Sequence, residues 1–187
     1  MTGITRRKLI GFGVTALSMA VTTPSFAAAM AAMPKKRDLK LHNIHSGETF
    51  AATYWANGHY IPGAMAEIRR VLRDTRTNTQ HEIDPTLVDL LVAIRNQLGA
   101  HEPFEVISGY RSPATNAALR MASHGVAEHS LHMQGRAIDV RLTGFPTARR
   151  ALLARAQRGG GTGYYRVSDF VHLDTGAVRI WGDPVDA

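Results

Sequence analysis

Two histidines and one carboxylate are spaced so that their side chains could meet at one point. His132 and Asp139 lie in the segment SLHMQGRAID, residues 130–139. Residues 137–142 alternate as a β-strand does, which places Asp139 on the face opposite Ile138. Gly135 allows the chain to turn, so we expect His132 to return over Asp139.

The second histidine of interest, His172, lies in the segment FVHLD, residues 170–174. If this segment is a strand beside residues 137–142, His172 and Asp174 share the face that carries Asp139. Two neutral imidazoles and a carboxylate then form a three-ligand zinc site whose fourth position is open to water. Zinc can lower the pKa of that water to about 7. The alternative is a His–Asp pair that braces the sheet without a metal, and the residue pattern leaves both open.

The elements that must position these residues are helices, mostly early in the chain, and short strands. Helices are predicted at residues 62–74, 85–98, 112–122 and 146–158, and the second is the clearest because Asp84 caps it and Gly99 ends it. Residues 159–163, GGGTG, are predicted to be a mobile connector. Strands are predicted at 39–45, 48–55, 104–108, 137–142, 170–174 and 178–181. This order favours the α+β class, with a small antiparallel sheet flanked by helices.

The N-terminus has the pattern of an export signal. Arg6-Arg7 precede a mildly apolar run, and residues 25–27 (SFA) offer small residues for cleavage. The run is too short and too rich in glycine for a membrane span, so we expect no stable membrane anchor after cleavage. The predicted division is a twin-arginine signal peptide at 1–27, a linker at 28–38 and one domain at 39–187. The twin-arginine route leads to the periplasm.

Composition narrows the chemistry further. The chain has no cysteine, which excludes thiolate ligands and a cysteine nucleophile. Its net charge of +7 includes three basic residues of the predicted leader. The remaining positive bias suits an acidic polymer such as the cell wall and is too weak to indicate a nucleic-acid partner.

Several motifs resemble those of a known family. The pattern S-x-H-x-x-G-x-A-x-D with a later histidine resembles the zinc signature of the D-Ala-D-Ala peptidases, whose fold is shared with the hedgehog signalling domain. The segments ISGYRS (107–112), GYY (163–165), FVHLDTG (170–176) and LHNIHSGE (41–48) resemble the murein endopeptidase K branch of that family. The likeness covers nearly the whole chain after the leader.

The resemblance implies a hedgehog/DD-peptidase-like fold, one Zn²⁺ per chain and a murein peptide as substrate. It implies His132, Asp139 and His172 as zinc ligands. It also implies that Arg111 binds substrate and stabilises the oxyanion, an electrostatic role that a fixed cation can fill. Further implied roles are substrate binding for Ser130 and Tyr110, the general base for Asp169, and a hydrogen bond to a ligand imidazole for Asp174, which is also the rival candidate for the base.

Three functions are therefore open at the level of sequence. The first is endopeptidase action on murein cross-links. The second is a DD- or LD-carboxypeptidase that trims stem peptides. The third is a zinc-stabilised wall-binding module without turnover, against which the arginine and the acidic residues beside the ligands argue. The oligomeric state is not predicted.

Overall fold

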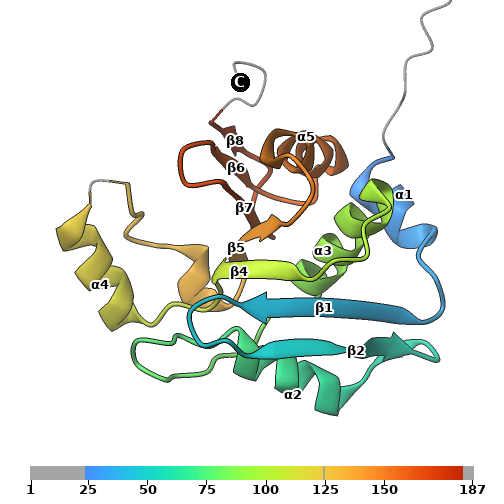
Figure 1. The fold of residues 1–187 in the computed structure, drawn as a ribbon, viewed down its shortest axis with the longest axis horizontal. Helices are drawn as coiled ribbons and strands as arrows, with labels where there is room; N and C mark the ends of the chain where they lie inside the picture. Colours follow the sequence, from blue (N-terminus) through green and yellow to red (C-terminus); the bar gives the residue numbers. More distant parts are fainter. Residues whose placement is uncertain (1–23, 124, 183–187) are drawn as a thin grey trace, which may run out of the picture.

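The structure, a computed structural model, describes residues 24–123 and 125–182 and is built on one mixed sheet (Figure 1). The strand order is β3-β2-β1-β4-β5-β7-β6-β8. The pairs β1/β4 and β6/β8 are parallel and the others are antiparallel. The strands are β1 (Arg37–Asn43), β2 (Thr49–Ala56), β3 (His59–Tyr60), β4 (Phe104–Ser108), β5 (Ala137–Leu142), β6 (Thr162–Tyr165), β7 (Phe170–Asp174) and β8 (Ile180–Trp181).

Helices α2, α3 and α5 pack on the sheet, and the helices of the described chain have the following bounds. They are α1 (Phe26–Ala31), α2 (Pro62–Val71), α3 (Pro85–Leu98), α4 (Pro113–Ala122), α5 (Thr147–Gln157) and the 3₁₀ turn η1 (Leu131–Gln134). Asp84 accepts a hydrogen bond from the Thr86 backbone N–H at the start of α3, and Gly99 ends it in the left-handed conformation at φ 63°. In Figure 1, α4 stands apart from the other helices at the left of the view, whereas α1 and α3 lie toward the right. Among the described residues no helix combines the length and apolar character needed to cross a bilayer.

The core lies between α2, α3 and the sheet. Alternate residues of β1, such as Leu39 and Leu41, are almost fully buried there. Ile138 and Val140 of β5 and Leu173 of β7 belong to the same buried cluster. Because side chains alternate along a strand, the residues between them lie on the face away from these helices, which is where the site is built.

The α+β class is confirmed, but the sheet is larger than the small antiparallel one predicted from sequence. Two features enlarge it. β1 pairs in parallel with β4, a contact between segments some sixty residues apart, at Leu41 and Phe104. The stretch predicted to be a mobile connector instead runs into β6, where Gly163 pairs with both His172 and Trp181.

Parts of the range 28–38, predicted to be a linker, belong to a helix and a strand. α1 extends into this range and ends at Ala31, and β1 begins in it at Arg37. The Arg37 guanidinium pairs with the buried carboxylate of Asp89, with 2.8 Å between Nη1 and Oδ1. Residues 1–23, which include the twin-arginine pair, lie outside the described residues, so the division of the chain into leader, linker and domain stays a prediction.

Candidate active site

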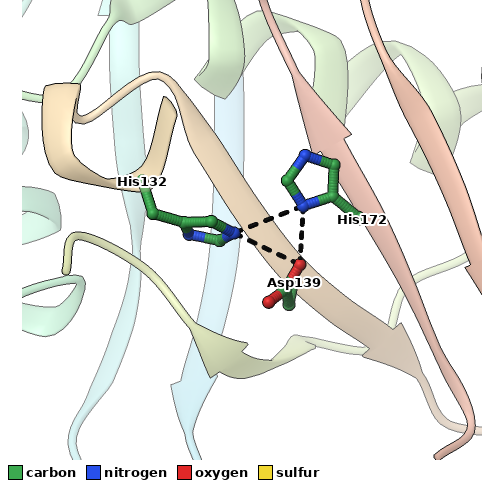
Figure 2. Close-up of side chains that lie close together, drawn as sticks. All are labelled: His132, Asp139 and His172. Atoms are coloured by element: carbon green, nitrogen blue, oxygen red, sulfur yellow. Dashed lines mark hydrogen bonds and ion pairs between the residues drawn. The ribbon is translucent and has the colours of Figure 1, made fainter. Parts of the chain in front are cut away.

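The side chains of His132, Asp139 and His172 converge on one point (Figure 2). The Nδ1 atom of His172 lies 2.9 Å from Oδ1 of Asp139 and 3.3 Å from Nε2 of His132. Nε2 of His132 lies 3.4 Å from the same Asp139 oxygen. All three side chains are largely buried. The meeting of these three residues, expected from their spacing, is present.

Two strands and one turn produce this arrangement. β5 and β7 are antiparallel neighbours, and Asp139 pairs directly with His172 in their register. η1 carries His132 and ends at Gly135, which has φ 64°. A Cβ at Gly135 would also overlap the backbone carbonyl of Glu82, so glycine is required here by both conformation and space. The chain can therefore fold His132 back over Asp139.

Each imidazole is oriented through its second nitrogen. His132 Nδ1 lies 2.7 Å from the carbonyl oxygen of Gly109, to which it can donate a hydrogen bond. His172 Nε2 lies 3.0 Å from Oδ2 of Asp174. These contacts direct Nε2 of His132 and Nδ1 of His172 toward Asp139, the pattern of a metal-binding histidine whose other ring N–H is held by a carbonyl or a carboxylate.

Without a metal, the cluster is held by charge. Burial alone would lower the pKa of His172, but its hydrogen bonds to Asp139 and Asp174 raise that pKa to about 9. Burial alone would raise the pKa of Asp139, but the two imidazoles lower it well below its usual range. Burial likewise would raise the pKa of Asp174, and its hydrogen bonds with His172 and backbone N–H groups lower it to about 2. A cation bound at Nδ1 of His172 would take the place of a proton.

The donor set fits a zinc ion. Zinc binds imidazole nitrogen and carboxylate oxygen at about 2.0–2.2 Å, so tetrahedral ligand atoms lie about 3.3 Å apart. The three ligand–ligand distances of 2.9, 3.3 and 3.4 Å are close to that value. Two nitrogens and one oxygen also leave a position for water or substrate.

Arg111 lies beside the three residues with unused donors. Its Nη2 atom is 3.8 Å from Oδ2 of Asp139 and 3.3 Å from Oγ of Ser108, and Nη1 is 3.4 Å from Oδ1 of Asn116. Its Nε is buried and has no hydrogen-bond partner within the described chain. Burial lowers the pKa of Arg111, although Asp139 acts in the opposite direction. The guanidinium is thus fixed in place and can still donate to an oxygen atom in the cleft.

These residues lie at the floor of a cleft of about 500 Å³. One wall comes from the segment after α4, including Val126 and His129, and the other from β6, β7 and β8. Asn116 supports the first wall, because its Nδ2 donates to the carbonyls of Ala127 and Glu128 at 3.1 and 3.3 Å. The cleft is large enough for a peptide segment.

The structure also gives the positions of the other three residues with predicted roles. Ser130 lines the cleft but is buried, and its Oγ accepts from the backbone N–H of His132 at 3.3 Å, which caps η1. Tyr110 is buried and stacks on His81 with ring centroids 4.9 Å apart. Asp169 is exposed at φ 50°, accepts a hydrogen bond from Thr147 and does not line the cleft. The structure brings none of these three into the cluster of His132, Asp139 and His172.

Residues that the sequence did not single out complete the site. Asn116 and Ser108 hold Arg111, and Arg179 binds Asp174 through two nitrogens at 2.6 and 3.2 Å. Trp181 packs on His172. Arg179 and Trp181 come three and five residues after the end of the FVHLDTG motif. This closeness in sequence to His172 was the one available signal.

A buried pair of imidazoles and a carboxylate lies beside a fixed arginine in an open cleft, an arrangement that suits metal-assisted hydrolysis. A family model described as peptidoglycan L,D-endopeptidase MepK matches residues 31–181. The chain is 41% identical to the peptidoglycan L,D-endopeptidase MepK of Escherichia coli K12 over 177 residues, 94% of this chain and 96% of that protein. The probable peptidoglycan L,D-endopeptidase MepK of Haemophilus influenzae is 39% identical, over 94% of this chain and 95% of that protein.

The chain belongs to the peptidoglycan L,D-endopeptidase MepK family. It is a hydrolase that acts on peptide bonds of peptidoglycan, or murein. The resemblance inferred from the motifs is thereby confirmed.

Proposed function

We propose that the chain is a zinc-dependent endopeptidase that hydrolyses L,D-peptide bonds in murein cross-links, in the periplasm. The observation that carries the metal part is the set of ligand–ligand distances between His132, Asp139 and His172. The bond type is taken from the names of the relatives from Escherichia coli and Haemophilus influenzae. The location follows from the substrate and from the twin-arginine pattern of the leader.

His132 Nε2, Asp139 Oδ1 and His172 Nδ1 would hold the zinc ion, one per chain. When bound, zinc supplies a Lewis acid and lowers the pKa of a bound water to about 7. Asp174 and the Gly109 carbonyl orient the two imidazoles from behind. Arg111 lies where it can donate hydrogen bonds to the carbonyl oxygen of the bond that is cut, and it stabilises the negative charge that develops there.

Asp174, the rival candidate for the general base, is fully buried and bonded to the ring of His172, which leaves two candidates for the group that accepts the proton during hydrolysis. Asp169, predicted from its place three residues before His172, has its carboxylate turned toward Thr147 and away from the cleft. His129 lines the cleft, and an imidazole nitrogen can accept a proton from a nearby water. Loss of a general base typically lowers kcat by about 10²–10⁴. Asp169→Asn and His129→Gln, compared at saturating zinc, therefore assign the role to the variant that shows this loss.

The proposed function is tested on purified sacculi and on isolated cross-linked muropeptide dimers. We expect the protein without its leader to convert L,D-linked dimers to monomers, as read by chromatography and mass spectrometry, and to leave D,D-linked dimers intact. Release of single amino acids from monomers would instead identify the carboxypeptidase alternative. His132→Ala is the inactive control, and retention of full activity by that variant would refute the metal site. Binding to sacculi without turnover would identify a wall-binding module.

A further inference from the structure

An arginine and three aromatic side chains form one wall of the cleft without a role in the mechanism above. Tyr165, Phe170 and Trp181, here called the aromatic wall, line the cleft together with Arg179. Tyr165 and Phe170 stack at 4.4 Å between ring centroids, and the Trp181 indole N–H donates to the Tyr165 hydroxyl at 3.1 Å. Tyr165 remains partly exposed. An apolar surface of this kind inside an enzyme cleft is suited to ligand contact.

The wall lies directly beside a residue of the proposed metal site. The ring of Trp181 is 5.1 Å from the ring of His172, measured between centroids. The guanidinium carbon of Arg179 is 5.3 Å from the centroid of Trp181. A substrate residue next to the bond that is cut would therefore lie against this wall, with Arg179 near the end of its side chain.

Arg179 is held in place but keeps free donors. Its two Nη atoms face the carboxylate of Asp174 at 2.6 and 3.2 Å, and Nη1 also contacts the Ala177 carbonyl at 3.3 Å. No hydrogen bond from its Nε is present within the described chain, and 47% of the side chain is exposed. Asp174 is fully buried, and its carboxylate also accepts hydrogen bonds from the ring of His172 and from the backbone N–H groups of Gly161 and Gly176. Arg179 can thus bind a second carboxylate from the cleft side at little entropic cost, because Asp174 already orients it.

The charge of the cleft favours an anionic ligand. The charged side chains that line it are Arg111, Arg179 and Asp139, together with the imidazoles. Asp139 is assigned to the metal, so no carboxylate of the described lining remains to repel an anion. Arg111 and Arg179 come from different elements, the link before α4 and the segment before β8, and one is assigned to the peptide carbonyl. The other is available for a second negative group.

Three glycines make this wall possible. A Cβ at Gly163 would overlap the indole of Trp181, and a Cβ at Gly161 would lie 2.8 Å from Nη1 of Arg179. A Cβ at Gly176 would lie 3.1 Å from Oδ1 of Asp174 and 3.2 Å from Nη1 of Arg179. Gly161 before β6, Gly163 inside it and Gly176 after β7 thus provide the space in which Arg179 and Trp181 lie beside His172.

We propose that the aromatic wall and Arg179 form a subsite for a substrate residue that carries a carboxylate at the end of an aliphatic chain. The aromatic rings pack on the methylene groups, and Arg179 binds the carboxylate. The subsite rests on the proposed endopeptidase function and specifies the side chain next to the cleaved bond: an aliphatic chain that ends in a free carboxylate. The same residue with this carboxylate converted to an amide is a poorer ligand.

The test uses two synthetic cross-linked peptides that differ only in this carboxylate, free in one and amidated in the other. We expect the zinc-loaded wild type to show a KM about tenfold lower for the free acid, the effect of one charge-assisted contact at a half-exposed arginine. Arg179→Gln should abolish this preference by raising the KM of the acid alone, and Arg179→Lys should keep part of it. Calorimetry with the two product peptides, one with the free acid and one with the amide, gives the same comparison without turnover.

Two further variants separate the subsite from a structural role. Gly163→Ala, which displaces Trp181, should raise KM for both peptides, and it should have no further effect in a Trp181→Ala background. Arg70→Ala is the matched control, because Arg70 on α2 also binds carboxylates, those of Glu48 and Glu67. Zinc content must stay at one per chain in each variant.

Loss of zinc in Arg179→Gln would overturn the assignment of Arg179 to the subsite. Equal KM values of wild type for acid and amide, or an equal rise in KM for both peptides in Arg179→Gln, would also overturn it. Failure of wild type to cleave either peptide would instead refute the proposed function.

Discussion

Asp174→Asn is the substitution whose effect on the metal site the structure defines most sharply. The Asp174 side chain is fully buried and accepts hydrogen bonds at both oxygens. Oδ2 faces Nε2 of His172 at 3.0 Å, and Oδ1 faces the backbone N–H groups of Gly161 and Gly176 at 3.0 and 2.8 Å. A carboxamide has one acceptor oxygen and one donor nitrogen, so it cannot satisfy both sides.

The two orientations of the asparagine have different consequences for zinc. With its nitrogen toward His172, the amide donates to Nε2 and favours the tautomer that carries its proton on Nδ1, the atom assigned to the metal. With its oxygen toward His172, the correct tautomer is kept, but the amide N–H groups face the two glycine N–H donors. Each buried donor without an acceptor costs about 1–3 kcal/mol. Zinc binding requires the second orientation, so about 2 kcal/mol is lost, which corresponds to about 30-fold weaker zinc binding.

The assay is competition for zinc between the protein and a chromophoric chelator, with urea unfolding of the metal-free protein measured in parallel. We expect zinc affinity to fall by about 10- to 100-fold, and activity to recover in excess zinc. Asp38→Asn is the control, because Asp38 is exposed and its carboxylate accepts a hydrogen bond from Thr53, which an amide oxygen can also accept. Zinc affinity of Asp174→Asn within threefold of wild type would show that Asp174 does not select the tautomer of His172.

Four further results are expected. The protein should bind about one zinc per chain, and His172→Ala should lose it, as measured by elemental analysis. In the metal-free protein the pKa of His172 is raised to about 9 from its ordinary 6.5, so its contribution to stability, about 3 kcal/mol at most, is present below pH 6.5 and is lost as the pH rises through 9; urea unfolding of wild type and His172→Gln at pH 6 and 9.5 measures it. Arg111→Ala should lower both kcat and kcat/KM by about 10²–10³ while zinc content stays unchanged, and normal kinetics would remove Arg111 from the transition state. Replacing Arg6 and Arg7 with lysine should leave the precursor in the cytoplasm, as seen by cell fractionation, and normal periplasmic accumulation would exclude the twin-arginine route.

The part of the site that could be predicted rests on short-range geometry. Strand alternation places Asp139 opposite Ile138 and places His172 opposite Val171, whatever the rest of the fold does. Gly135 permits the one turn that returns His132. The only long-range assumption was that residues 137–142 and 170–174 pair, and β5 and β7 do pair, with Asp139 opposite His172.

The parts that could not be predicted depend on contacts between distant segments. The glycine-rich stretch from residue 159 resembles a flexible connector because glycine lowers strand propensity. The strand that it enters, β6, depends on distant residues. Trp181 and Asp174 fill the space that side chains at Gly163 and Gly161 would need. Tyr110 follows the same rule, since its burial against His81 depends on a segment outside its own motif.

The positions of the two carboxylates that flank His172 follow from where β7 begins and ends. Asp174 is two residues after His172 inside the strand, so it shares the face of His172 and reaches its ring nitrogen. Asp169 precedes the first residue of β7 and has φ 50°, a left-handed conformation that breaks the alternation and turns its carboxylate toward Thr147 on α5. Asp169 lies three residues before His172. That spacing predicts the direction of its side chain only if β7 extends back to Asp169, and β7 begins at Phe170. Asp169 and His129 therefore stay the two candidates for the proton acceptor, and of these two only His129 lines the cleft.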